Sequence, residues 1–196
     1  MRIALVLLAA CSPSPSASID SGEPPRIDAP APDVTGAPLR VFTTGAFLGT
    51  LYESGGGLAA GDTKCARAAG DAALDGTWRA WLSTTAVNAP DRIAGVGPWY
   101  LPDRTTLLFA SRAQFVTGPS HPIDQLSNGE SLDSNVPVWT GTTIGGTAAS
   151  ATCADWTVDQ SSSGRAGRLD ATNAAWTDDT TLTCGTYAYL YCFEQP

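Results

Sequence analysis

Histidine and basic residues are scarce in this sequence. Among 196 residues there is one histidine, His121, and 11 lysine and arginine residues stand against 19 aspartate and glutamate residues, giving a net charge of −8. One histidine cannot build a multi-histidine metal centre, and its Pro-Ser-His-Pro setting is typical of a solvent-facing loop residue rather than a catalytic one. The negative charge repels phosphate backbones and anionic headgroups. Nucleic-acid and heparin-type binding are therefore both disfavoured.

The motifs of common catalytic sites are missing too. The sequence contains no G-x-S-x-G, no H-E-x-x-H, no phosphate-binding loop and no dinucleotide fingerprint. Gly55–Gly57 is a flexible break, since no Gly-Lys-Ser or Gly-Lys-Thr follows it. The cysteines show no C-x-x-C spacing, which disfavours a zinc site. We therefore expect no catalytic residues and a protein that is not an enzyme.

Long hydrophobic runs are also absent. The longest apolar stretch near the start, Ile3 to Ala10, is far shorter than the roughly 20 residues of a membrane span, but after Arg2 it fits a signal peptide. It ends in Leu8-Ala9-Ala10-Cys11, which resembles the lipobox of bacterial lipoproteins, whose cysteine is lipidated. Two or three acyl chains anchor a protein stably. An ordinary secretory signal with an incidental Cys11 is the alternative.

The resemblance to lipoproteins and the proline content together divide the chain. Residues 1–10 are expected to be the lipoprotein signal peptide, and Ser12 after the cysteine resembles an outer-membrane sorting choice. Seven of the 14 prolines lie between Ser12 and Pro38, where hydrophobic periodicity is absent. We expect lipidated Cys11 and a disordered tether over 11–38, one folded domain over 39–196, and a location in the bacterial cell envelope, anchored by lipid to the outer membrane.

Short strands and one helix are expected in the first half of the domain. Leu39–Thr44 and Ala46–Tyr52 have the β-branched and apolar content of strands, and Thr77–Leu82 places Trp78 and Trp81 on opposite faces. Asp62 is the expected helix N-cap. The expected apolar face of that helix, which ends before Gly76, comprises Cys65, Ala69, Ala72 and Ala73.

Several of these segments together resemble endostatin, the C-terminal domain of certain collagens and a variant of the C-type lectin-like fold. The similar segments are Gly61–Cys65, Gly76–Ser83, Asp103–Phe115, Val136–Gly141, Cys153–Trp156, Cys184 and Cys192–Glu194. The resemblance covers residues 39–194 and extends to bacterial lipoproteins such as the endostatin-like outer-membrane proteins of Leptospira. It implies an α+β fold with small, mostly antiparallel sheets, one main helix and long loops. The histidines through which endostatin binds zinc are missing here.

Four cysteines remain when Cys11 is assigned to lipid, and they allow three pairings. The resemblance implies the nested one, Cys65–Cys192 and Cys153–Cys184. In the chain-entropy model the outer bridge contributes about 4–5 kcal/mol and the inner one about 3–4 kcal/mol.

The last strand carries the candidates for ligand contact. Tyr187 to Phe193 alternates with period two, which puts Tyr187, Tyr189 and Tyr191 on one face of a central strand. An aromatic face of this kind packs in a core more often than it forms a ligand platform. The three tyrosines are therefore the candidates for a ligand-facing surface, with packing as the competing interpretation.

Asp178 and Asp179 are the only candidates for a metal site. They follow Trp176 near the position of the Trp-Asn-Asp motif of calcium-dependent C-type lectins, but Thr177 replaces the amide and the second lectin motif is absent. Calcium needs six to eight oxygen ligands, and two adjacent carboxylates do not supply them. We expect no cofactor and a solvated turn at Asp178–Asp179, with calcium as the alternative.

The expected function is that of a surface-facing or periplasm-facing, lipid-anchored binding module that recognises a protein or glycan partner without catalysis. The leptospiral proteins that it resembles act like adhesins for host matrix and complement-regulatory proteins. The alternatives are a structural or envelope-assembly lipoprotein, a calcium-dependent sugar-binding domain, and an enzyme, which rests on fold analogy alone.

Overall fold

The computed structural model describes residues 38–52, 56–133, 135–157 and 160–196. The expected signal peptide over residues 1–10, Cys11 and the expected tether lie outside these residues. Within the described part, no helix combines the length and the apolar character that crossing a membrane requires. The described part is a mixed α+β structure whose sheets are mostly antiparallel, with one main helix, as expected.

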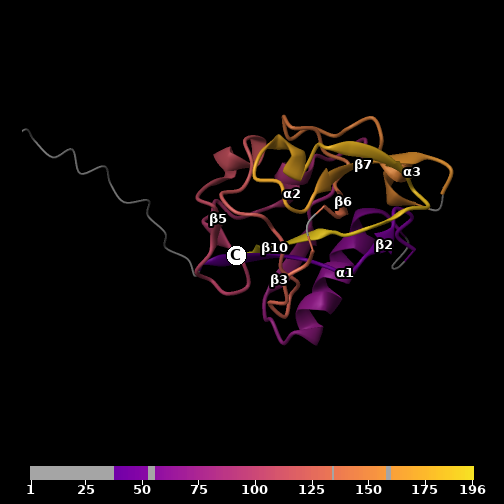
Figure 1. Cartoon of the computed structure of the whole chain (residues 1–196). Coiled ribbons are helices and arrows are strands. Elements are labelled where there is room, and N and C mark those ends of the chain that lie inside the picture. The colour runs from indigo at the N-terminus through magenta and orange to yellow at the C-terminus, as the bar shows by residue number, and fades with distance from the viewer. Residues whose placement is uncertain (1–37, 53–55, 134, 158–159) are drawn as a thin grey trace, which may run out of the picture. The chain divides into compact units, whose positions relative to one another are not determined.

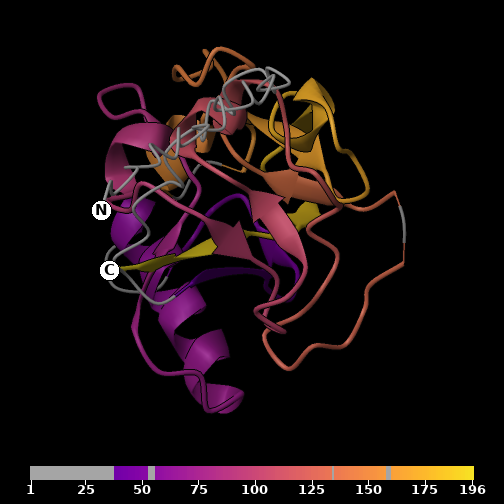
Figure 2. The ribbon, with the colours of Figure 1, turned by 90° about the vertical axis from the view of Figure 1, so that its left-hand side faces the viewer.

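The largest sheet is five-stranded and has the order β3-β10-β1-β4-β5. Its strand β10, from the C-terminus, pairs antiparallel with both β1 and β3, and only the β1–β4 pair is parallel. This places the last strand of the chain in the interior of the sheet (Figures 1 and 2). The strands are β1 (Leu39–Thr43), β3 (Thr77–Ala80), β4 (Trp99–Tyr100), β5 (Leu107–Phe109) and β10 (Tyr191–Gln195).

Two smaller sheets hold the remaining strands. One has the order β6-β7-β8, and the other consists of β2 and β9. Tyr189 connects them to each other, because Trp139 N donates to Tyr189 O at 2.9 Å and Tyr189 N donates to Pro137 O at 3.0 Å. The strands are β2 (Phe47–Leu48), β6 (Pro137–Trp139), β7 (Ser163–Arg168), β8 (Thr180–Thr183) and β9 (Tyr187–Ala188).

The main helix, α1 (Gly57–Asp71), packs beside β3 and β10 (Figure 1). Its buried face consists of Ala60, Gly61, Cys65 and Ala69. A Cβ added to Gly61 would lie 3.1 Å from the Ala80 Cβ, so these small residues allow the helix to approach the sheet closely. The other helices are short: α2 (Ala89–Arg92), η2 (Arg112–Val116), α3 (Cys153–Trp156) and η3 (Ala174–Trp176).

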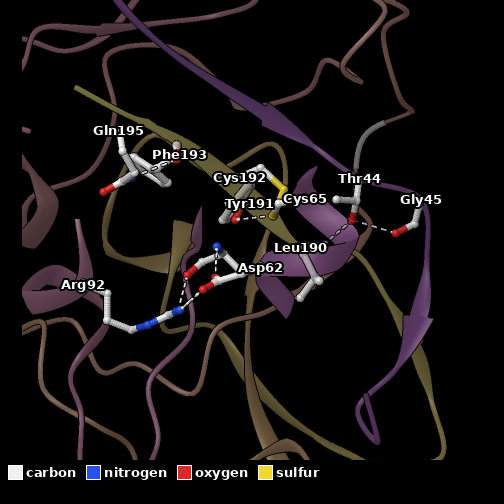
Figure 3. The surroundings of a disulfide bond; sticks show 11 residues. Thr44, Gly45, Asp62, Cys65, Arg92, Leu190, Tyr191, Cys192, Phe193 and Gln195 are labelled. Carbon is white, nitrogen blue, oxygen red and sulfur yellow. Dashed lines mark hydrogen bonds and ion pairs between the residues drawn. A yellow bond between two sulfur atoms is a disulfide. The ribbon is translucent and has the colours of Figure 1, made fainter. Parts of the chain in front are cut away.

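The expected helix start at Asp62 is wrong. The N-cap is Gly56, six residues earlier, and its φ of 81° favours glycine. Asp62 lies in the second turn, where its carboxylate accepts hydrogen bonds from Ala80 N at 2.9 Å and from the Arg92 guanidinium at 2.7 Å (Figure 3). Its role is to join the helix to β3 and α2. The predicted face also extends too far, because Ala72 and Ala73 lie beyond the helix and are not buried.

Two apolar clusters form the core, and the two tryptophans of the Trp-Arg-Ala-Trp segment belong to different ones. Trp78 lies in the cluster that contains α1, whereas Trp81 lies in the other. Trp81 contacts three further rings, with centroid distances of 4.7 Å to Trp176, 4.9 Å to Phe115 and 5.4 Å to Phe193. The expectation of two tryptophans on opposite faces is confirmed.

Both disulfides are present with the nested pairing. Cys65–Cys192 joins α1 to the interior strand β10, with Cα atoms 5.4 Å apart (Figure 3). Cys153–Cys184 joins α3 to the residue that follows β8, with Cα atoms 5.6 Å apart. All four cysteines are fully buried.

The inner disulfide ends at an unusual left-handed turn. All four residues of α3 have φ between 50° and 64°, although none is glycine. Such a conformation costs about 1–2 kcal/mol per residue. It is held by the disulfide at Cys153, by the Trp156 indole N–H, which donates to Ser83 O at 2.7 Å, and by Asp155. The Asp155 carboxylate accepts two hydrogen bonds of 2.7 Å from Thr85, and although burial opposes ionisation, these bonds lower its pKa.

Candidate functional site

The three tyrosines that the sequence places on one face do not share it in the structure. Tyr187 is 65% exposed, Tyr189 is half-buried and Tyr191 is fully buried. The expectation that Tyr191 faces a ligand is therefore wrong. The reason is that Tyr187–Phe193 is not one strand: the chain leaves β9, pairs with β6 at Tyr189, and enters the five-stranded sheet as β10.

Tyr191 has a structural role. Its ring packs 5.6 Å from Trp176, and its hydroxyl donates to Arg168 O at 3.3 Å. Burial raises the pKa of this hydroxyl far above its ordinary value, so it stays protonated. A protonated hydroxyl is the form that can donate this hydrogen bond.

Tyr187 belongs to an exposed surface that also includes Tyr52, which is 56% exposed. The register of β2 and β9 places Tyr187 opposite Leu48. Leu48 precedes Tyr52 by four residues in the sequence. The Gln160 side chain donates to the Tyr52 hydroxyl at 2.9 Å and lies about 4 Å from the Cβ position of Gly185, two residues before Tyr187. We call Leu48, Tyr52, Gln160 and Tyr187 the tyrosine surface.

The backbone beneath the tyrosine surface is fixed at several points. Gly49 N donates to Cys184 O at 2.9 Å, and Leu51 N donates to Trp156 O at 3.3 Å. Both acceptors belong to the region held by the inner disulfide. A Cβ on Gly49 would lie 2.5 Å from the Cys153 sulfur, so only glycine allows this approach. The exposed tyrosines are therefore carried by a constrained scaffold.

The sequence pattern does not single out Tyr52 as a contact residue. The expected strand over Ala46–Tyr52 would make Tyr52 an ordinary strand residue, but strand pairing is limited to Phe47–Leu48. After Leu48 the backbone pairs with Cys184 and Trp156 instead. Such long-range partners cannot be deduced from a local pattern.

Asp178 and Asp179 are each paired with an arginine. The Asp178 carboxylate lies 2.7 Å from Arg165 Nε and also accepts from Ile144 N at 2.9 Å. The Asp179 carboxylate lies 3.4 Å from the Arg168 guanidinium. Neither residue belongs to a group of three or more acidic, histidine or cysteine side chains that could hold a metal within the described part of the chain.

Other polar residues with chemical potential also have structural partners. His121 is exposed, and its Nδ1 lies 3.0 Å from Leu107 O. The buried Arg40 is held by Glu194, and Arg92 is held by Asp62. These charged groups fix loops and strands to one another. The tyrosine surface is the feature among the described residues that best fits contact with a partner.

No protein-family model matches this chain, and a search of curated proteins finds no match either.

Proposed function

We propose that this chain is a lipid-anchored binding module without catalytic activity, which contacts a protein partner through the tyrosine surface. The single observation that carries the proposal is the exposure of Tyr52 and Tyr187 at 56% and 65% on a scaffold fixed beside the inner disulfide. The α+β arrangement and the two nested disulfides support placing the domain in the endostatin-like variant of the C-type lectin-like fold.

Rigidly held tyrosines suit protein recognition for physical reasons. A tyrosine offers a large contact area with few rotatable bonds, so little conformational entropy is lost on binding. Tyrosine is also enriched among the residues that dominate interface energies. The net charge of −8 favours encounter with partners of neutral or basic surface. Adhesion to such a partner from a membrane tether is the function that these features support.

Alanine substitution at the tyrosine surface is expected to weaken partner binding. Tyr187→Ala and Tyr52→Ala should each lower affinity by about 30-fold or more, because loss of a hot-spot side chain costs about 2 kcal/mol or more. The measurement is capture of proteins from matrix and envelope extracts by the full chain, followed by titration of the identified partner against each variant.

The control is Val96→Ala, which removes an apolar side chain that is 74% exposed and lies outside the tyrosine surface. This variant should bind like the original protein. Equal binding by all three variants would contradict the assignment of the tyrosine surface. Partners found only among envelope components would favour the structural or envelope-assembly role over adhesion.

The lipid anchor is tested by Cys11→Ala. This variant has no sulfur for acylation, so it should move from the detergent phase to the aqueous phase in a Triton X-114 partition. Cys65→Ala is the control, because this residue pairs with Cys192 and should leave partitioning unchanged. Retention of the Cys11→Ala variant in the membrane fraction would contradict the anchor.

A further inference from the structure

One face of the β6-β7-β8 sheet carries an open pocket of about 220 Å³. The strand register explains its composition, since Pro137 lies opposite Arg168, Ala166 opposite Thr180, and Gly164 opposite Leu182. Residues 164, 166 and 168 alternate onto one face of β7, so their partners share that face. The lining side chains include Asn135, Pro137, Arg168, Asp179, Thr180 and Leu182.

The charged side chains around the pocket carry a net negative charge. Arg168 Nε lies 2.7 Å from Asp170, and its terminal nitrogen lies 3.4 Å from Asp179. One cation therefore faces two carboxylates. An anionic ligand would have to approach two carboxylates that already neutralise the single arginine, so this site disfavours phosphate, sulfate and carboxylate groups.

The polar side chains that line the pocket include both hydrogen-bond donors and hydrogen-bond acceptors. The Arg168 guanidinium can only donate, the Asp179 carboxylate can only accept, and Thr180 and Asn135 can do either. A hydroxyl group both donates and accepts, so two neighbouring hydroxyls of one ligand can satisfy an arginine and an aspartate together. Pro137 and Leu182 add apolar surface beside these groups, which fits the C–H face of a sugar ring.

We infer that this pocket binds one neutral sugar unit, as a free monosaccharide or as the terminal residue of a glycan. The two carbon-rich side chains pack against the ring, and Asp179, Arg168 and Thr180 bind its hydroxyls. The pocket volume of about 220 Å³ is below the range of about 300–1,000 Å³ that is typical for drug-sized ligands. A ligand smaller than these, such as one sugar ring, therefore fits it. The site shares no lining residue with the tyrosine surface and goes beyond the function proposed above.

The test titrates the full chain with glucose, galactose, mannose and N-acetylglucosamine, and with glucuronate as the anionic counterpart, using ligand-observed NMR. At least one neutral sugar should bind at millimolar concentration, and glucuronate should bind more weakly. Thr180→Val and Asp179→Asn should each weaken binding of that sugar by about 10-fold, because a site built for hydroxyls loses affinity when a partner is removed.

A neighbouring substitution serves as the matched control. Thr181→Val changes the next residue of β8, which lies opposite Arg165 on the other face and does not line the pocket. It should alter affinity less than 2-fold. No binding by any neutral sugar, preference for glucuronate, or an equal loss in Thr181→Val would overturn the inference. A thermal melt of each variant shows that the fold is kept, and binding at the tyrosine surface should be unchanged throughout.

Discussion

Replacement of Cys65 and Cys192 by alanine is expected to lower the free energy of unfolding by about 4–5 kcal/mol. The bridge closes a sequence separation of 127 residues, and this loop restricts the unfolded chain strongly. It also joins the main helix to a strand that has neighbours on both sides. Since domains of this kind are stable by about 5–15 kcal/mol, the loss amounts to a large part of the total.

The inner disulfide provides the comparison for this prediction. It closes only 31 residues, for which the same model gives about 3–4 kcal/mol. Urea denaturation, followed by the fluorescence of the buried tryptophans, measures both double-alanine variants against the original protein. The variant without Cys65–Cys192 should unfold at the lower urea concentration. The opposite order would show that the left-handed turn held by Cys153 contributes more than loop closure does.

Two kinds of sequence signal predict the structure well. One is a short local alternation within a strand, and the other is a resemblance carried by several segments of the chain at once. The alternation in Thr77–Leu82 correctly assigned Trp78 and Trp81 to different sides of the sheet, because strand geometry forces successive side chains apart. The disulfide pairing followed from the resemblance to endostatin, and its geometry is confirmed. The α+β class follows from the same resemblance, whereas the helix is predicted from the helical spacing of Cys65 and Ala69.

The features that could not be predicted depend on tertiary partners. The period-two pattern of Tyr187–Phe193 treats the segment as one strand, but the chain changes sheets near Tyr189, and the exposure of each tyrosine differs accordingly. A helix that starts after a glycine with positive φ has no side-chain cap to recognise, and the local pattern therefore points to Asp62 instead. The pocket beside Arg168 arises from the pairing of strands that are far apart in the chain.

Removal of the Glu194 side chain is expected to cost nearly as much as loss of the outer disulfide. Its carboxylate accepts three hydrogen bonds from Arg40: one from the backbone N–H at 2.9 Å, and two from the guanidinium at 2.8 Å and 2.6 Å. Both side chains are largely buried, at 5% and 11% exposure. Glu194→Ala leaves the Arg40 charge buried without its main partner, which costs about 3–5 kcal/mol. Urea denaturation measures this loss.

Asp75 provides the control for Glu194→Ala. Like Glu194, it pairs with Arg40, at a distance of 2.8 Å, but its own side chain is 90% exposed. Water solvates this carboxylate and weakens its attraction, so Asp75→Ala should hardly change the unfolding midpoint. The double variant Arg40→Met with Glu194→Leu removes both buried charges at once. It should be clearly more stable than Glu194→Ala, since the cost of that variant comes from a charge left without a partner. Equal losses in the Glu194→Ala and Asp75→Ala variants would show that burial of the Glu194 carboxylate does not make its pair with Arg40 the more important one.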